Sequence, residues 1–134
     1  MILPDIWQYG YHTSPSVNRD SILRRGLLTM KPSNSWGSGL EDQPTGVYLM
    51  KDEQIAEEWP KSSLVTFSDM HPYKRCDTFD LYRVFMDRLS LVANEILTDP
   101  ALEYTKWAAQ VILKDIPTNC IELVKQDIEW DIHS

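Results

Sequence analysis

The chain has 134 residues, of which 43% are hydrophobic, and its 13 Lys and Arg against 20 Asp and Glu give a net charge of −7. This length and composition fit one globular domain spanning residues 1–134, with a core that can form without disulfides or metal. The acidic balance argues against general binding to nucleic-acid phosphates, and no apolar run approaches the ~18–20 residues that cross a bilayer.

The N-terminal third predicts a strand followed by a short helix. Aromatic residues alternate with small or polar ones over residues 6–11, which indicates a strand. Ser14-Pro15 is a typical N-cap and first-turn pair, so we expect a short helix to follow and to run through Ile22 to Arg25. Gly26 is its expected stop signal.

A long loop and a compact strand–helix pair come next. We expect an extended piece over residues 27–30 and a surface loop over 31–45, which holds two Pro, two Gly, three Ser and an Asn. The apolar run over 46–50 predicts a buried strand. Asp52 is expected to cap a helix that carries Ala56 and Trp59 and that Pro60 ends.

The second half predicts mostly short strands. They are expected over residues 64–67, 79–86, 107–113 and 120–124. The strand over 79–86 has a pattern that allows a bulge, and the pattern over 91–97 is ambiguous. We expect a turn over residues 72–77 and a corner at Ile116-Pro117. The last ten residues are weakly patterned. Many short strands with few helices indicate an α+β or mainly-β mixed domain.

Several strong motifs are absent. The chain contains no G-x-x-x-x-G-K-[ST] loop, C-x-x-C, H-E-x-x-H or G-x-S-x-G, and its three histidines lie far apart in the sequence. A zinc enzyme or a Ser–His hydrolase therefore has little support, and we expect no metal. The Met1–Asp5 segment lacks the basic and apolar parts of a signal peptide. We therefore expect a cytoplasmic protein in which Cys76 and Cys120 are buried thiols.

Three segments form one constellation in chain order. The first is Tyr11-His12-Thr13-Ser14, followed by a helix pattern that ends in Gly26-Leu27. The second is Gly46-Val47-Tyr48-Leu49, and the third is Gln110-Val111-Ile112-Leu113, which leads into Ile116-Pro117. This order resembles the ADP-ribosyltransferase superfamily of the diphtheria-toxin and poly(ADP-ribose) polymerase type. The resemblance covers residues 9–124.

The resemblance implies an α+β domain with split, mostly antiparallel sheets around an NAD cleft. It implies transfer of ADP-ribose from NAD to an acceptor with release of nicotinamide. In this family His12 would hold the nicotinamide-side ribose. The backbone of Thr13, where glycine is frequent, would grip the carboxamide. Tyr48 would stack on nicotinamide, and Trp59, eleven residues later, has the spacing of a second stacking aromatic. The implied NAD-binding set is His12, Thr13, Ser14, Tyr48 and Trp59.

Gln110 matches the third position of the implied catalytic set, His12, Tyr48 and Gln110, where the family most often has glutamate. A glutamine can orient a ribose hydroxyl, but it carries no charge to stabilise an oxocarbenium-like centre. Activity could therefore be mono-transfer, acceptor-specific, weak or absent. Glu103 and Glu122 are possible substitutes, although both fit the motif less well.

Other interpretations stay open for these residues. His12 could be a satisfied structural histidine, Tyr48 a core residue, and Trp59 a plug between helix and sheet. Arg19, Arg24 and Arg25 could form a solvated helix face, or could contact the NAD phosphates or a nucleic-acid acceptor.

Two functions compete with NAD-dependent transfer. One is a catalytically silent copy of the fold that binds or inhibits a partner through the loop over 31–45. The other is an enzyme similar to RNA 2′-phosphotransferases, which needs several arginines to hold a phosphate. The charge of −7 favours a protein or small molecule as acceptor, without excluding nucleic acid.

Overall fold

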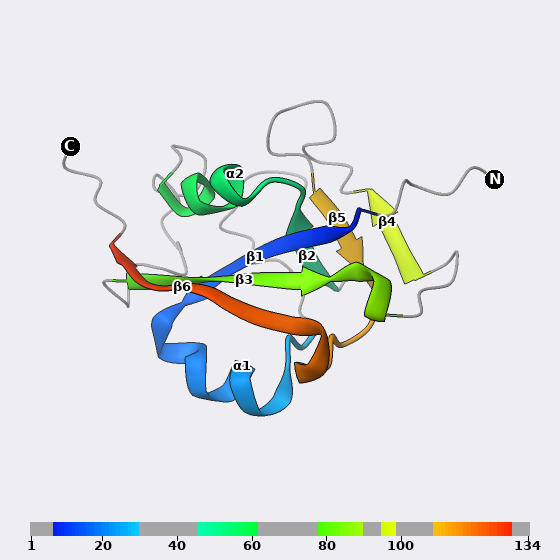
Figure 1. Ribbon diagram of the computed structural model, residues 1–134, viewed down its shortest axis with the longest axis horizontal. Coiled ribbons are helices and arrows are strands. Elements are labelled where there is room, and N and C mark those ends of the chain that lie inside the picture. Colours follow the sequence, from blue (N-terminus) through cyan, green and yellow to red (C-terminus); the bar gives the residue numbers. More distant parts are fainter. Residues whose placement is uncertain (1–6, 30–45, 62–77, 90–94, 99–108, 130–134) are drawn as a thin grey trace, which may run out of the picture.

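A computed structural model describes residues 7–29, 46–61, 78–89, 95–98 and 109–129, which form one antiparallel sheet with a short helix on each face (Figure 1). The strands are β1 (Tyr9–Pro15), β2 (Val47–Met50), β3 (Thr78–Phe85), β4 (Ile96–Thr98), β5 (Ala109–Ile112) and β6 (Ile121–Glu129). The helices are α1 (Arg19–Arg25) and α2 (Glu53–Glu58). The order across the sheet is β4-β5-β2-β1-β3-β6, so β1 and β2 are central strands.

The two faces of the sheet bury separate apolar clusters. Residues directly opposite each other in an antiparallel pair share a face, and neighbours along a strand alternate. The cluster on the α1 face contains Ile22, Leu27, Val47, Leu49, Tyr82, Val84, Met86, Leu89, Ile96, Ile112, Ile116 and Cys120. The cluster on the α2 face contains Met50, Ala56, Trp59, Phe79, Leu81 and Ala109. The sheet therefore separates two cores, each closed by one helix.

Local sequence signals explain both helices. The Asp52 carboxylate accepts hydrogen bonds from the backbone N–H groups of Gln54 and Ile55 at 2.9 and 3.1 Å, which confirms it as the α2 cap. Gly26 ends α1 with a φ of 84°, a conformation that glycine adopts without strain. The next residue, Leu27, forms a bridge with Ile116, so the turn at Gly26 brings α1 against the β5–β6 connection.

Several predicted elements are confirmed and others are wrong. The strand over 46–50, the helix after Asp52 and the strand over 79–86 correspond to β2, α2 and β3. Ser14-Pro15 does not begin a helix. These residues end β1, opposite Asp80 and Phe79, and a 3₁₀ turn over Ser16–Asn18 precedes α1.

The C-terminal strand is longer than its sequence pattern predicts. β6 continues past Val124 to Glu129. Two register irregularities against β3 interrupt its alternation, and Asp127 has a φ of 56°, so the sequence pattern of the strand ends before the strand does. The irregularity expected in 79–86 thus occurs in the β3–β6 pairing, with the extra residues on β6.

The coarse α+β class is confirmed, whereas the described strands form one open sheet rather than the split sheets that the resemblance implied. The strands β4-β5-β2 and the strands β3-β6 belong to the same sheet because β1 pairs with β2 on one side and with β3 on the other. The predictions for 31–45, 64–67 and 72–77, like Cys76 and Glu103, lie outside the described residues.

Candidate functional site

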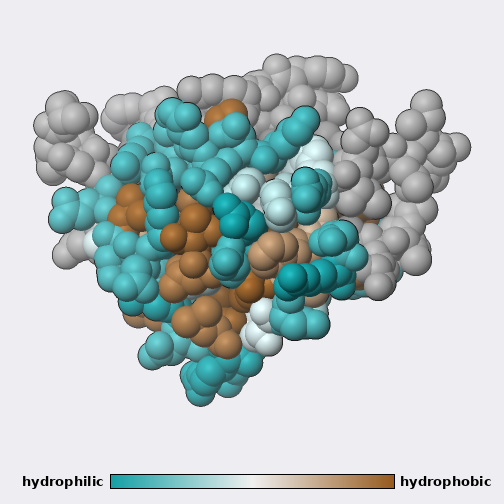
Figure 2. Space-filling model, in the orientation of Figure 1, coloured by the Kyte–Doolittle hydropathy of each residue, from teal (hydrophilic) through white to brown (hydrophobic). Residues whose placement is uncertain are grey.

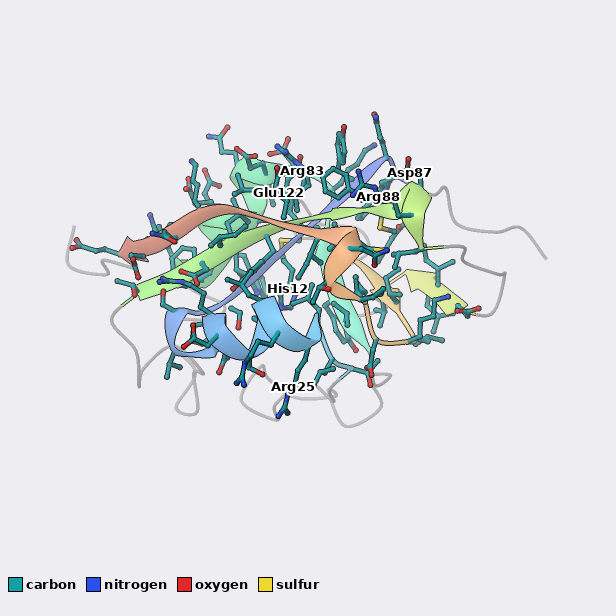
Figure 3. The ribbon with its side chains drawn as sticks, turned by 60° about the horizontal axis from the view of Figure 1, so that its bottom comes forward. His12, Arg25, Arg83, Asp87, Arg88 and Glu122 are labelled. Atoms are coloured by element: carbon teal, nitrogen blue, oxygen red, sulfur yellow. The ribbon has the colours of Figure 1, made fainter. Side chains whose placement is uncertain are left out.

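His12 lies at the centre of the sheet on its α1 face. It is directly opposite Tyr82, a residue of the α1-face cluster, and Figure 3 places it between the strands and α1. The ring is half-buried, and its Nδ1 lies 3.0 Å from the backbone oxygen of Tyr48. Burial lowers the pKa of His12 below its ordinary 6.5, although the hydrogen bond to the Tyr48 carbonyl acts in the opposite direction.

These facts fix the chemical state of the imidazole. A carbonyl oxygen only accepts, so Nδ1 carries the hydrogen and donates it to Tyr48. With the pKa of His12 lowered, the ring is neutral at pH 7, and its Nε2 is then a hydrogen-bond acceptor. His12 is therefore suited to accept a hydrogen bond from a hydroxyl group.

The three strands that carry the expected triad are neighbours, in the order β5-β2-β1. Gln110 on β5 is opposite Leu49 on β2, so it shares the α1 face with His12. It is only 4% exposed. Because β2 lies between them, the backbones of Gln110 and His12 are about 10 Å apart, two strand spacings.

Tyr48 and Trp59 lie on the other side of the sheet. Tyr48 alternates with Leu49 and pairs with Val111, which directs its side chain to the α2 face. Trp59 is 9% exposed and packs in the α2-face cluster with Met50 and Ala56. The structure thus brings His12 and Gln110 to one face, and the two aromatic rings to the opposite face. The hydrogen bond to His12 is made by the backbone carbonyl of Tyr48.

The neighbouring expected residues also divide between the faces. Thr13 is opposite Leu81 and belongs to the α2 face. Ser14 is buried opposite Asp80, and its hydroxyl accepts a hydrogen bond from the Asn18 amide at 3.0 Å. Glu122, a proposed substitute for the missing glutamate, is exposed on the edge strand β6, far along the sheet from Gln110.

A buried carboxylate that the motif search missed organises the α1 side of the sheet. Asp80 on β3 is 0% exposed. Its two oxygens accept hydrogen bonds from Arg19 Nε at 2.8 Å, Arg19 Nη2 at 2.9 Å, the Ser16 hydroxyl at 2.8 Å and the Asp127 N–H at 2.9 Å. In the sequence, Asp80 could have been recognised as a single acidic residue at a core-facing position of an apolar strand.

The hydrogen bonds to Asp80 change the interpretation of Arg19, Arg24 and Arg25, the three arginines singled out in the sequence. Arg19 is held by Asp80 and Asp127, and these partners raise its pKa. Arg24 donates to the backbone oxygen of Asp20 at 3.3 Å, and Arg25 is exposed at the outer side of α1 (Figure 3). The three arginines therefore do not converge on one point.

Cys120 is a buried free thiol, as expected, and burial raises its pKa.

Within the described ranges, no group of three or more His, Cys, Asp or Glu is placed to hold a metal ion, and no helix is long and apolar enough to cross a membrane. The sequence matches no protein-family model and no curated protein.

Proposed function

We propose that this protein transfers ADP-ribose from NAD to an acceptor and releases nicotinamide, as a mono-ADP-ribosyltransferase. One observation carries the proposal. Segments that resemble that superfamily, remote in the sequence, lie on the adjacent strands β1, β2 and β5, and a hydrogen bond between His12 and Tyr48, 36 residues apart, joins two of them.

The chemistry of the α1 face suits a ribose. The Nε2 of neutral His12 accepts a hydrogen bond from a ribose hydroxyl, and Gln110, on the same face, carries an amide of the kind that can orient such a hydroxyl. His12 is only half-buried, so a ligand can reach it. Fixing the ribose favours departure of nicotinamide as the acceptor attacks the anomeric carbon, because orientation lowers the barrier without a metal.

The aromatic rings do not fit the expected stacking in this arrangement. Tyr48 and Trp59 lie across the sheet from His12, so neither contacts a nicotinamide bound beside it. This placement favours a second candidate, a catalytically silent module of the same fold that binds a partner. The RNA 2′-phosphotransferase alternative loses support because Arg19 is bound to Asp80 and Asp127.

Binding and turnover of NAD decide between the two candidates. NAD that binds only the folded protein stabilises it by about 2.7 kcal/mol at 100 times its dissociation constant, which a thermal shift detects. His12→Ala should weaken NAD binding by about 1–3 kcal/mol, since a ribose hydrogen bond is lost. Tyr48→Ala keeps the carbonyl that holds His12 and should weaken binding less. An equal loss in both variants would place the Tyr48 ring in the site.

Gln110 tests the chemical step. Gln110→Glu should raise nicotinamide release, because a carboxylate near the developing cation stabilises the transition state more than the ground state. Burial can protonate that carboxylate, so release is measured over a pH series that extends upward. Gln54→Glu, an exposed position on α2, is the matched control. Absence of NAD binding and of nicotinamide release in every protein would overturn the proposal and leave the binding module.

A further inference from the structure

A hollow opens where the start of β1 meets the end of β2. It has a volume of about 210 Å³ and is lined by Trp7, Gln8, Tyr9, Tyr11 and Lys51. Tyr9 and Tyr11 are two residues apart on β1 and opposite Phe85 and Arg83, so both rings point to the α2 face. His12 points to the other face, and the hollow is therefore separate from the site proposed above.

The two tyrosine rings are held in place from the β3 side. The Arg83 guanidinium lies 5.3 Å from the centre of the Tyr9 ring and 5.8 Å from that of Tyr11, within the range of cation–π attraction. Phe85 meets Tyr9 edge to face at 5.7 Å. Rings fixed in this way lose little conformational entropy when a ligand stacks on them, so the hollow is preorganised for a flat ligand.

The charges around the hollow leave one cation for a ligand. Arg83 is already paired with Glu122 at 2.7 Å and with Glu53 at 3.4 Å, on the side of the sheet away from His12 (Figure 3). Lys51 is exposed, and no hydrogen bond or ion pair engages it among the residues that the structure describes. An anionic group bound in the hollow would therefore meet Lys51.

Size and charge limit what the hollow can hold. Pockets for drug-sized ligands usually measure about 300–1,000 Å³, so a hollow of about 210 Å³ takes one ring system rather than a dinucleotide. The net charge of −7 opposes a long track of phosphate contacts. The observations thus favour one flat ring joined to one nearby anion.

We propose that this hollow binds a nucleobase that carries a phosphate, with the base stacked on the rings of Tyr9 and Tyr11 and the phosphate paired with Lys51. Every nucleobase has a flat face that stacks on aromatic side chains. The Gln8 amide, with donors and an acceptor, can meet a base edge. The ligand is either a free mononucleotide or one unpaired residue of a single-stranded nucleic acid.

Calorimetry with defined probes tests the proposal. The probes are AMP, adenosine, ribose 5-phosphate, a single-stranded oligoadenylate of eight residues and a proline-rich decapeptide. AMP should bind more tightly than adenosine or ribose 5-phosphate, since it alone of the three has both the base and the phosphate. If AMP and the oligonucleotide bind equally well, one residue suffices. Tighter binding of the oligonucleotide identifies single strands as the source.

Variants then assign the contacts. Tyr9→Ala should raise the dissociation constant by about 5- to 150-fold, which corresponds to the loss of one stacked base, whereas Tyr9→Phe keeps the ring and should change it little. Lys51→Ala should weaken binding of AMP and of the oligonucleotide, and for the oligonucleotide it should lower the slope of log K against log salt by about one. Lys61→Ala, at an exposed lysine beyond α2 that does not line the hollow, should do neither.

Three results would overturn the proposal. One is binding of the proline-rich peptide with none of the nucleotides. Another is nucleotide binding that neither Tyr9→Ala nor Lys51→Ala weakens, and the third is oligonucleotide binding whose salt slope is the same in wild type and Lys51→Ala. Lys51 is exposed, so its variant reports on binding even if Tyr9→Ala fails to fold. AMP binding that Tyr9→Ala weakens separates this hollow, on the α2 face, from His12 on the other face of the sheet.

Discussion

Replacing Asp80 by asparagine should destabilise the fold far more than its small change in size suggests. Oδ1 of Asp80 accepts from Ser16, Arg19 and the Asp127 N–H, and Oδ2 accepts from Arg19 Nε. The amide of an asparagine replaces one of these oxygens with an NH₂ group. In either orientation that group would face hydrogen-bond donors.

The magnitude follows from the burial of Asp80. Breaking a buried ion pair by removing one partner costs about 3–5 kcal/mol. The Arg19 side chain is 26% exposed and can recover some hydration, so we expect the lower end for Asp80→Asn, about 3 kcal/mol. The loss should appear as a lower urea midpoint with an unchanged slope. Asp87→Asn, an exposed change of the same chemistry on the 3₁₀ turn after β3, should cost less than about 0.5 kcal/mol.

The stability difference should also depend on pH. Burial alone would raise the pKa of Asp80, but hydrogen bonds from Arg19, the Asp127 N–H and Ser16 outweigh it and hold that pKa below its ordinary 3.8. The contribution of this carboxylate is therefore complete above its unfolded pKa and is lost as the pH falls through the folded pKa. The gap in the free energy of unfolding between wild type and Asp80→Asn should therefore narrow as the pH falls below about 4.

His12 adds a second acid sensitivity that both proteins share. Its folded pKa lies below 6.5, so stability falls as the pH drops below that value, and this effect cancels in the difference between the two proteins. Equal urea midpoints for Asp80→Asn and Asp87→Asn at pH 7, or a gap that stays constant down to pH 3, would refute the reasoning about the Asp80 network.

Two further changes test how the helices end and begin. Gly26→Ala should destabilise the fold by more than about 1 kcal/mol, because φ is positive there and the added Cβ would overlap the Ile116 carbonyl oxygen; thermal unfolding measures the loss. Asp52→Ala should cost about 0.5–2 kcal/mol, since the N–H groups of Gln54 and Ile55 lose their acceptor, whereas Asp52→Asn should retain most of that stability in the same denaturation series.

The sequence by itself determined the elements whose signals are local. Asp52 marks the start of α2 because its side chain reaches N–H groups only two and three residues away. Gly26 marks the end of α1 because a positive φ favours glycine over any other residue. The apolar run that ends at Met50 and the alternation after Thr78 predict β2 and β3 for similar reasons. In each case the neighbouring residues supply the physical cause.

Only the tertiary structure decided which residues share a face. Val47 to Met50 are all apolar or aromatic, so the sequence does not tell which of them face α1, and the pairing of Leu49 with Gln110 sends Tyr48 to the opposite side from His12. The motif that predicted a triad is a linear order of residues, whereas a shared site requires a shared face. Strand register sets the face, and one residue of shift reverses it.

The sequence also does not predict which side chains contact each other over long distances along the chain. Arg19 meets Asp80 across 61 residues, and Arg83 meets Tyr11 across 72. Nothing in either local segment identifies its partner, since each contact exists only after β3 has paired with β1. The length of β6 was underestimated for the same reason. Its bulges depend on its pairing with β3, and they disturb the alternation by which a strand is recognised in sequence.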